Sequence, residues 1–68
     1  MPSTVIRRFD YRPDTLELEI MFTTGRRYVY ADVPEEEIRG FRAAFSKGSY
    51  FNRRIRDRYR FREIDPVS

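Results

Sequence analysis

Seven basic side chains lie between Ser46 and Arg62, where Asp57 is the single acidic residue, so this segment has a net charge of +6. The first 45 residues contain seven basic and eight acidic side chains, so the net +3 of the whole chain comes from this segment. The basic residues are Lys47, Arg53, Arg54, Arg56, Arg58, Arg60 and Arg62. Aromatic residues alternate with them, namely Tyr50, Phe51, Tyr59 and Phe61. A guanidinium group binds phosphate through paired hydrogen bonds, and an aromatic ring offers a stacking surface, so the composition is typical of proteins that bind polyanions.

The seven basic residues and Tyr50 are therefore candidate nucleic-acid-binding residues, with the RNA or DNA phosphate backbone as the expected partner. Two other interpretations stay open. The arginines could pair within the fold with Glu17, Glu19 or the cluster Glu35–Glu37, or they could form a protein-interaction surface. A single acidic residue in the segment cannot neutralise six arginines, so we expect a nucleic-acid-binding surface there.

Catalysis is not expected, because the chain contains no histidine and no cysteine. These residues supply the usual general base, the usual metal ligand and the strongest nucleophile. A dyad of Lys47 with Ser46 or Ser49 would need a buried, neutral lysine, whereas this lysine lies in a basic turn. We predict a protein that is not an enzyme, with no catalytic residue, metal ligand or cofactor, and no small-molecule substrate.

The length of 68 residues predicts one domain, with the ordered part spanning about residues 3–64. Such a short chain without disulfides depends on its six Phe and five Tyr for burial, and dimerisation is a second route to stability. No segment approaches the roughly 20 apolar residues of a membrane span, and no signal peptide is visible at the N-terminus. We therefore expect a cytoplasmic protein.

Hydrophobic patterning predicts three antiparallel strands over 5–11, 15–22 and 26–31. Leu16, Leu18, Ile20 and Phe22 alternate with polar residues, as in a half-buried strand. Residues 12–14 have turn composition, and Gly25 can supply the positive φ that a hairpin loop needs. The three strands form a meander.

The position of Tyr28 and Tyr30 depends on the length of that hairpin loop. A three-residue loop over 23–25 places both tyrosines in the core with Leu18, Ile20 and Phe22. A two-residue loop places them on the open face, where they could stack on the bases of single-stranded RNA. We favour the core, because so small a protein needs its aromatic residues inside.

A helix is expected after the strands, with Pro34 in its first position and Glu35–Glu37 against its positive end. Ile38, Phe41 and Phe45 form its apolar stripe, and Gly48 ends it as a left-handed cap. Gly40 would weaken this helix, which indicates a close packing contact at that position.

A second short helix is expected over residues 49–58, with Phe51, Ile55 and Tyr59 on one face and Tyr50 on the outer side. Ser46 or Ser49 would cap it, although the segment 46–49 could also hold a phosphate on its N–H groups. The predicted fold class is thus α+β, a three-stranded antiparallel β-meander followed by two short helices packed on one face (β-β-β-α-α).

Several of these segments resemble the KTSC domain, a module of roughly 60 residues found at the C-terminus of some lysyl-tRNA synthetases and alone in bacterial and phage proteins. The resemblance is carried by Tyr28-Val29-Tyr30, by Val33-Pro34 and by residues 46–52 and 55–59. It implies a single domain with no catalytic residues, and its association with the synthetases suggests RNA binding. We therefore predict a small RNA-binding module, with a protein-interaction or homodimerisation module as the alternative.

Overall fold

The protein is described from a computed structural model that defines residues 6–64. Its centre is a four-stranded antiparallel sheet in the order β1-β2-β3-β4. The strands are β1 (Ile6–Arg12), β2 (Glu17–Phe22), β3 (Arg27–Tyr30) and β4 (Phe61–Ile64). The α+β class is confirmed, and the three predicted strands are present with ends shifted by one or two residues. Val5, the predicted start of the first strand, lies outside the described residues.

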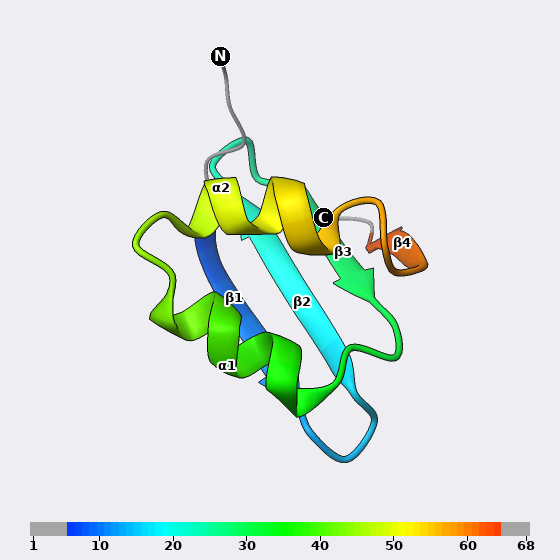
Figure 1. Ribbon diagram of the computed structural model, residues 1–68. Coiled ribbons are helices and arrows are strands. Elements are labelled where there is room, and N and C mark those ends of the chain that lie inside the picture. Colours follow the sequence, from blue (N-terminus) through cyan, green and yellow to red (C-terminus); the bar gives the residue numbers. More distant parts are fainter. Residues whose placement is uncertain (1–5, 65–68) are drawn as a thin grey trace.

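The fourth strand corrects the expected three-stranded meander. After the helices the chain returns to the outer edge of β3, where Phe61 opposes Tyr30 and Ile64 opposes Arg27 (Figure 1). Two of the residues 61–64 are charged and three are exposed, so the segment shows no alternation of buried and exposed side chains that would indicate a strand. They form a strand because β3 offers unpaired backbone N–H and C=O groups along that edge.

The hairpin between β2 and β3 has the three-residue loop that was favoured. Phe22 opposes Arg26, since the Phe22 N–H donates to the Arg26 carbonyl oxygen at 2.9 Å. Gly25 closes the loop with φ = 94°, a conformation that suits glycine. In this register Tyr28 opposes Ile20 and Tyr30 opposes Leu18, so both tyrosines lie on the face that carries the core.

The first helix, α1 (Glu35–Ala43), is shorter than predicted. Pro34 is its N-cap rather than its first residue, and the chain leaves the helix at Ala44, which is extended. The prediction of Gly48 as a left-handed cap is wrong, because Gly25 is the positive-φ glycine among residues 6–64. Phe45 consequently falls beyond the helix and is fully exposed instead of completing the apolar stripe.

The second helix is formed by α2 (Lys47–Tyr50) and the π-helical segment η1 (Phe51–Ile55), which follow each other without a break. Ser46 caps its start as predicted, accepting a hydrogen bond from the Ser49 N–H at 3.2 Å. The wider π turn is visible where the Arg56 N–H donates to the Phe51 carbonyl oxygen. Phe51 and Ile55 are buried and Tyr59 packs against the core, which confirms the predicted apolar face.

Both helices cover the same face of the sheet (Figure 1). The core between the layers consists of Leu18, Ile20, Tyr30, Val33, Ile38, Phe41, Phe51 and Ile55. Phe9 joins β1 to α1 through a ring contact with Phe41 at 4.6 Å between centroids. The Tyr11 hydroxyl donates to the Val33 carbonyl oxygen at 2.7 Å, which fixes the connection into α1. None of the helices in the described part is long and apolar enough to cross a membrane.

Candidate nucleic-acid interface

Arg53, Arg56 and Arg58 form an exposed cationic group at the second helix and the turn after it. Within residues 6–64 none of the three makes an ion pair with a carboxylate. Their guanidinium groups thus keep their full hydrogen-bonding capacity for an external anion. We call these three residues the helix-2 arginines.

Arg54 belongs to the same segment but is used within the fold. Its Nε lies 3.7 Å from the Glu37 carboxylate, and its guanidinium carbon lies 5.6 Å from the centre of the Tyr50 ring. The intramolecular pairing that the sequence left open therefore occurs at this position.

Arg60 and Arg62 do not belong to the same cationic surface as the helix-2 arginines. A guanidinium nitrogen of Arg60 lies 3.9 Å from a carboxylate oxygen of Asp32, and one of Arg62 lies 3.9 Å from a carboxylate oxygen of Glu17, so both arginines have an ion-pair partner. Arg62 opposes Val29 and points away from the helices, because side chains alternate along a strand and Phe61 faces the core side with Tyr30. The prediction grouped Arg60 and Arg62 with the arginines of the second helix because β4 was not expected.

The open face of the sheet is also largely neutralised. Guanidinium nitrogens of Arg12 lie 3.0 Å from a carboxylate oxygen of Glu19 and 3.6 Å from one of Glu17. A guanidinium nitrogen of Arg27 lies 3.5 Å from a carboxylate oxygen of Glu19. Exposed pairs of this kind add little stability, but they cancel positive charge on the surface. Arg12 and Arg27 on the open face are thus paired with carboxylates, whereas the helix-2 arginines are not.

Lys47 has a structural role that the sequence reading missed. Its ammonium group donates to the carbonyl oxygens of Arg42 and Ala44, both at 3.0 Å. These carbonyls lie at the C-terminal end of α1, where helical hydrogen bonding ends and a cation is favoured. Lys47 thus joins the two helices, and its donors are directed at backbone oxygens.

Tyr50 was expected on the outer side of its helix, but it lies against α1. A Cβ atom added to Gly40 would be 2.5 Å from the Tyr50 hydroxyl oxygen, so the glycine leaves room for the tyrosine. This is the close packing contact that Gly40 indicated. The ring also packs on Phe41 at 5.8 Å, and the Arg54 guanidinium lies over it, so the ring is already in contact with two side chains where a base would have to stack.

Glu37 joins this contact, although the sequence assigned it only a role at the start of α1. Its side chain is 9% exposed and accepts hydrogen bonds from the hydroxyls of Tyr50 at 2.5 Å and Tyr59 at 2.9 Å. The burial of Glu37 could have been predicted from the sequence, because Glu37 lies four residues before Phe41 and therefore on the same, buried side of the helix. Glu37 is an acidic anchor for two aromatic residues of the second helix.

Tyr28 and Tyr30 both contact other rings of the core face, so the alternative that placed them on the open face is wrong. Tyr30 is 3% exposed and packs on Phe51 at 5.4 Å, whereas Tyr28 is half-buried against Phe22 at 5.6 Å. Burial raises the pKa of Tyr30 to about 12, and neighbouring Tyr28 and Asp57 act in the same direction, against the charge of Arg56.

Alkaline titration should reveal the buried tyrosines. Burial, followed by the hydrogen bond to Glu37, raises the pKa of Tyr59 to about 12, whereas an unfolded tyrosine ionises near about 10. Because the folded state holds these protons more tightly, its stability is complete below pH 10 and decreases as the pH rises from 10 to 12. Tyr30 alone accounts for a loss of up to about 2–3 kcal/mol.

Ultraviolet absorbance of tyrosinate, recorded with circular dichroism, measures this expected shift. Tyr30 and Tyr59 should ionise last and together with unfolding, and Tyr30→Phe should reduce the loss of stability above pH 10. Ionisation of all five tyrosines near about pH 10 in the folded protein would contradict the burial described here.

No three side chains of His, Cys, Asp or Glu among residues 6–64 are arranged so that they could hold a metal ion. A family model described as the KTSC domain matches residues 2–59. The crystal structure of a KTSC domain protein from Yersinia pestis is similar, with a TM-score of 0.84 and 36% identity, over 96% of this chain and 92% of that chain.

Two curated proteins show similar levels of identity. An uncharacterised protein of Stutzerimonas stutzeri is 33% identical over 66 residues, which cover 96% of this chain and 93% of that protein. A lysine–tRNA ligase of Nostoc punctiforme is 34% identical over 61 residues, or 90% of this chain. The matched segment is only 11% of the length of the ligase.

Proposed function

The chain belongs to the KTSC domain family, and within it we propose that this protein is a small non-catalytic module of the cytoplasm that binds the phosphate backbone of single-stranded RNA. The helix-2 arginines carry the proposal, because they are the arginines of the segment Ser46–Arg62 that make no ion pair with a described carboxylate.

RNA is proposed ahead of DNA because a similar segment forms part of a lysine–tRNA ligase, a protein whose name identifies tRNA as its substrate. The binding would depend on charge rather than on base sequence, since guanidinium groups on one exposed helix face contact phosphates. Such a module would have modest affinity alone and would add affinity to a larger protein to which it is joined.

The salt dependence of binding tests this proposal. Three phosphate contacts on a single strand predict that log K falls with log salt with a slope of about −2. Affinity for a short single-stranded RNA should therefore fall about 10- to 20-fold between 50 and 200 mM salt, as measured by fluorescence anisotropy. A single-stranded DNA of the same sequence provides the comparison for the nucleic-acid class.

Binding that does not change with salt would overturn the phosphate proposal. A homodimer is the second candidate, and it is favoured by the full exposure of Phe45 in the loop between the helices. Absence of RNA binding together with a concentration-dependent dimer in sedimentation would assign the domain to assembly instead.

A further inference from the structure

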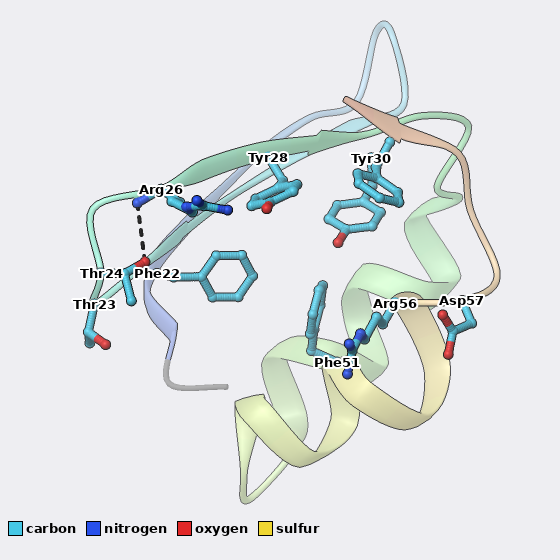
Figure 2. A pocket seen from close by; sticks show the side chains of 10 residues that line it. Phe22, Thr23, Thr24, Arg26, Tyr28, Tyr30, Phe51, Arg56 and Asp57 are labelled. Carbon is cyan, nitrogen blue, oxygen red and sulfur yellow. Dashed lines mark hydrogen bonds between the residues drawn. The ribbon is translucent and has the colours of Figure 1, made fainter. Parts of the chain in front are cut away.

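A cavity of about 510 Å³ lies between the end of the sheet and the second helix, and one of the helix-2 arginines, Arg56, borders it. It is lined by five aromatic rings from different elements: Phe22, Tyr28, Tyr30, Phe51 and Phe61. Arg26 and the loop residues Thr23 and Thr24 border it on one side, and Arg56 and Asp57 border it at the end of the second helix (Figure 2). Its volume lies in the usual range for small-ligand sites.

The rings hold one another in fixed positions around this space. Phe22 meets Tyr28 and Phe51 edge to face, both at 5.6 Å, and Phe61 meets Tyr28 at 5.5 Å and Tyr30 at 5.3 Å. Phe61 is 55% exposed, so the arrangement opens to solvent at the β4 side. Rigid aromatic surfaces that are open on one side suit a flat aromatic guest.

The hydroxyls of Tyr28 and Tyr30 are polar groups among these rings, and that of Tyr30 lies beside the second helix. Figure 2 shows it pointing from β3 toward Phe51 and the second helix. Although the residue is 97% buried, its hydroxyl makes no hydrogen bond to any other residue in the range 6–64. No buried side-chain nitrogen or oxygen within residues 6–64 lacks a hydrogen-bond partner, so this hydroxyl oxygen is reached by solvent in the cavity. A ligand in the cavity can accept a hydrogen bond from it or donate one to it.

Two arginines at the opening of the cavity, Arg26 and Arg56, supply the positive charge that a phosphate group needs. The guanidinium of Arg26 lies beside Tyr28 in Figure 2, and the loop is held by a hydrogen bond of 3.4 Å from the Arg26 N–H to Thr24 Oγ1. Arg56 approaches from the helix, and Arg26, whose Nε lies 3.8 Å from the Glu63 carboxylate, stands on the other side of the opening. Asp57 would repel a phosphate next to it, but its carboxylate can accept hydrogen bonds from the N–H groups of a base.

We propose that this cavity takes one unstacked base of single-stranded RNA, with the Tyr30 hydroxyl bonded to the edge of the base and Arg26 and Arg56 contacting the flanking phosphates. The inference rests on the proposed function and adds a base-binding subsite to it. A purely apolar guest would leave the Tyr30 hydroxyl unpaired, whereas a base offers both a stacking face and polar edge atoms.

The decisive experiment compares an RNA oligomer with a chain of the same length and phosphates that lacks bases. Stacking in the cavity predicts that the abasic chain binds about tenfold or more weakly. In NMR titrations the RNA should shift the ring signals of Phe22, Tyr28 and Phe51, while the abasic chain shifts only signals near the helix-2 arginines. Equal affinity of the two chains would overturn the subsite and keep the phosphate proposal, whereas failure of both chains to bind would overturn both.

A matched pair of variants tests the hydroxyl itself. Tyr30→Phe keeps the ring and removes a group without a partner, so the folded protein should be at least as stable and bind RNA about three- to tenfold more weakly. Tyr11→Phe removes a hydroxyl that bonds to Val33 and lies outside the cavity, so it should lower stability and leave RNA affinity unchanged. Unchanged RNA affinity of folded Tyr30→Phe would remove Tyr30 from the site.

Discussion

Replacing the helix-2 arginines Arg53, Arg56 and Arg58 together by glutamate is expected to lower the affinity for single-stranded RNA by about 100-fold or more at 0.1 M salt. Three lost phosphate contacts account for about two powers of ten at this salt concentration, and the new negative charges repel the strand in addition. The side chains are exposed and make no ion pair within the described residues, so the fold should be retained. Fluorescence anisotropy gives the affinity, and circular dichroism checks the fold.

The control for this variant is a protein of the same net charge in which three other arginines are reversed. Arg7, Arg8 and Arg39 are also exposed and unpaired within residues 6–64, and they lie on β1 and α1. Reversing all three likewise changes the net charge of the chain from +3 to −3, because each substitution removes two charges. This control should retain most of the affinity, whereas equal losses in both variants would mean that overall charge, not the helix-2 arginines, controls binding.

The largest effect on stability is expected from Glu37→Ala, at about 3 kcal/mol. The substitution leaves the hydroxyls of Tyr50 and Tyr59 and the guanidinium of Arg54 without their shared acceptor. Each buried group that loses its partner costs about 1–3 kcal/mol. A domain of this size rarely has more than about 3–5 kcal/mol in total, so a large unfolded fraction should appear at room temperature.

Urea denaturation followed by circular dichroism measures this loss. Glu36→Ala is the matched control, because Glu36 is the exposed neighbour on the same helix and its removal should change stability by less than about 0.5 kcal/mol. Glu37→Gln keeps the shape and one acceptor oxygen, so its stability should lie between those of the two alanine variants. Equal stability of the Glu37→Ala and Glu36→Ala proteins would show that the carboxylate does not anchor the second helix.

Periodic patterns in the sequence were sufficient for much of the fold. Alternation at Leu18, Ile20 and Phe22 placed β2, and the three-residue loop ending in Gly25 fixed the register that turns Tyr28 and Tyr30 inward. Spacing of Ile38 and Phe41, and of Phe51 and Ile55, placed the buried faces of both helices. These features depend on residues near one another in the chain, so local rules describe them well.

The tertiary structure decided which arginines remain available, because ion pairing depends on residues far apart in sequence. Arg62 meets Glu17 only because the segment Phe61–Ile64 adds to the free edge of β3, and Arg54 meets Glu37 only because two helices lie side by side. The cavity has the same origin, since its rings come from β2, β3, β4 and the second helix. The sequence alone determined the amount of positive charge and the segment that contains it, whereas long-range packing decided where that charge is cancelled and where it faces solvent.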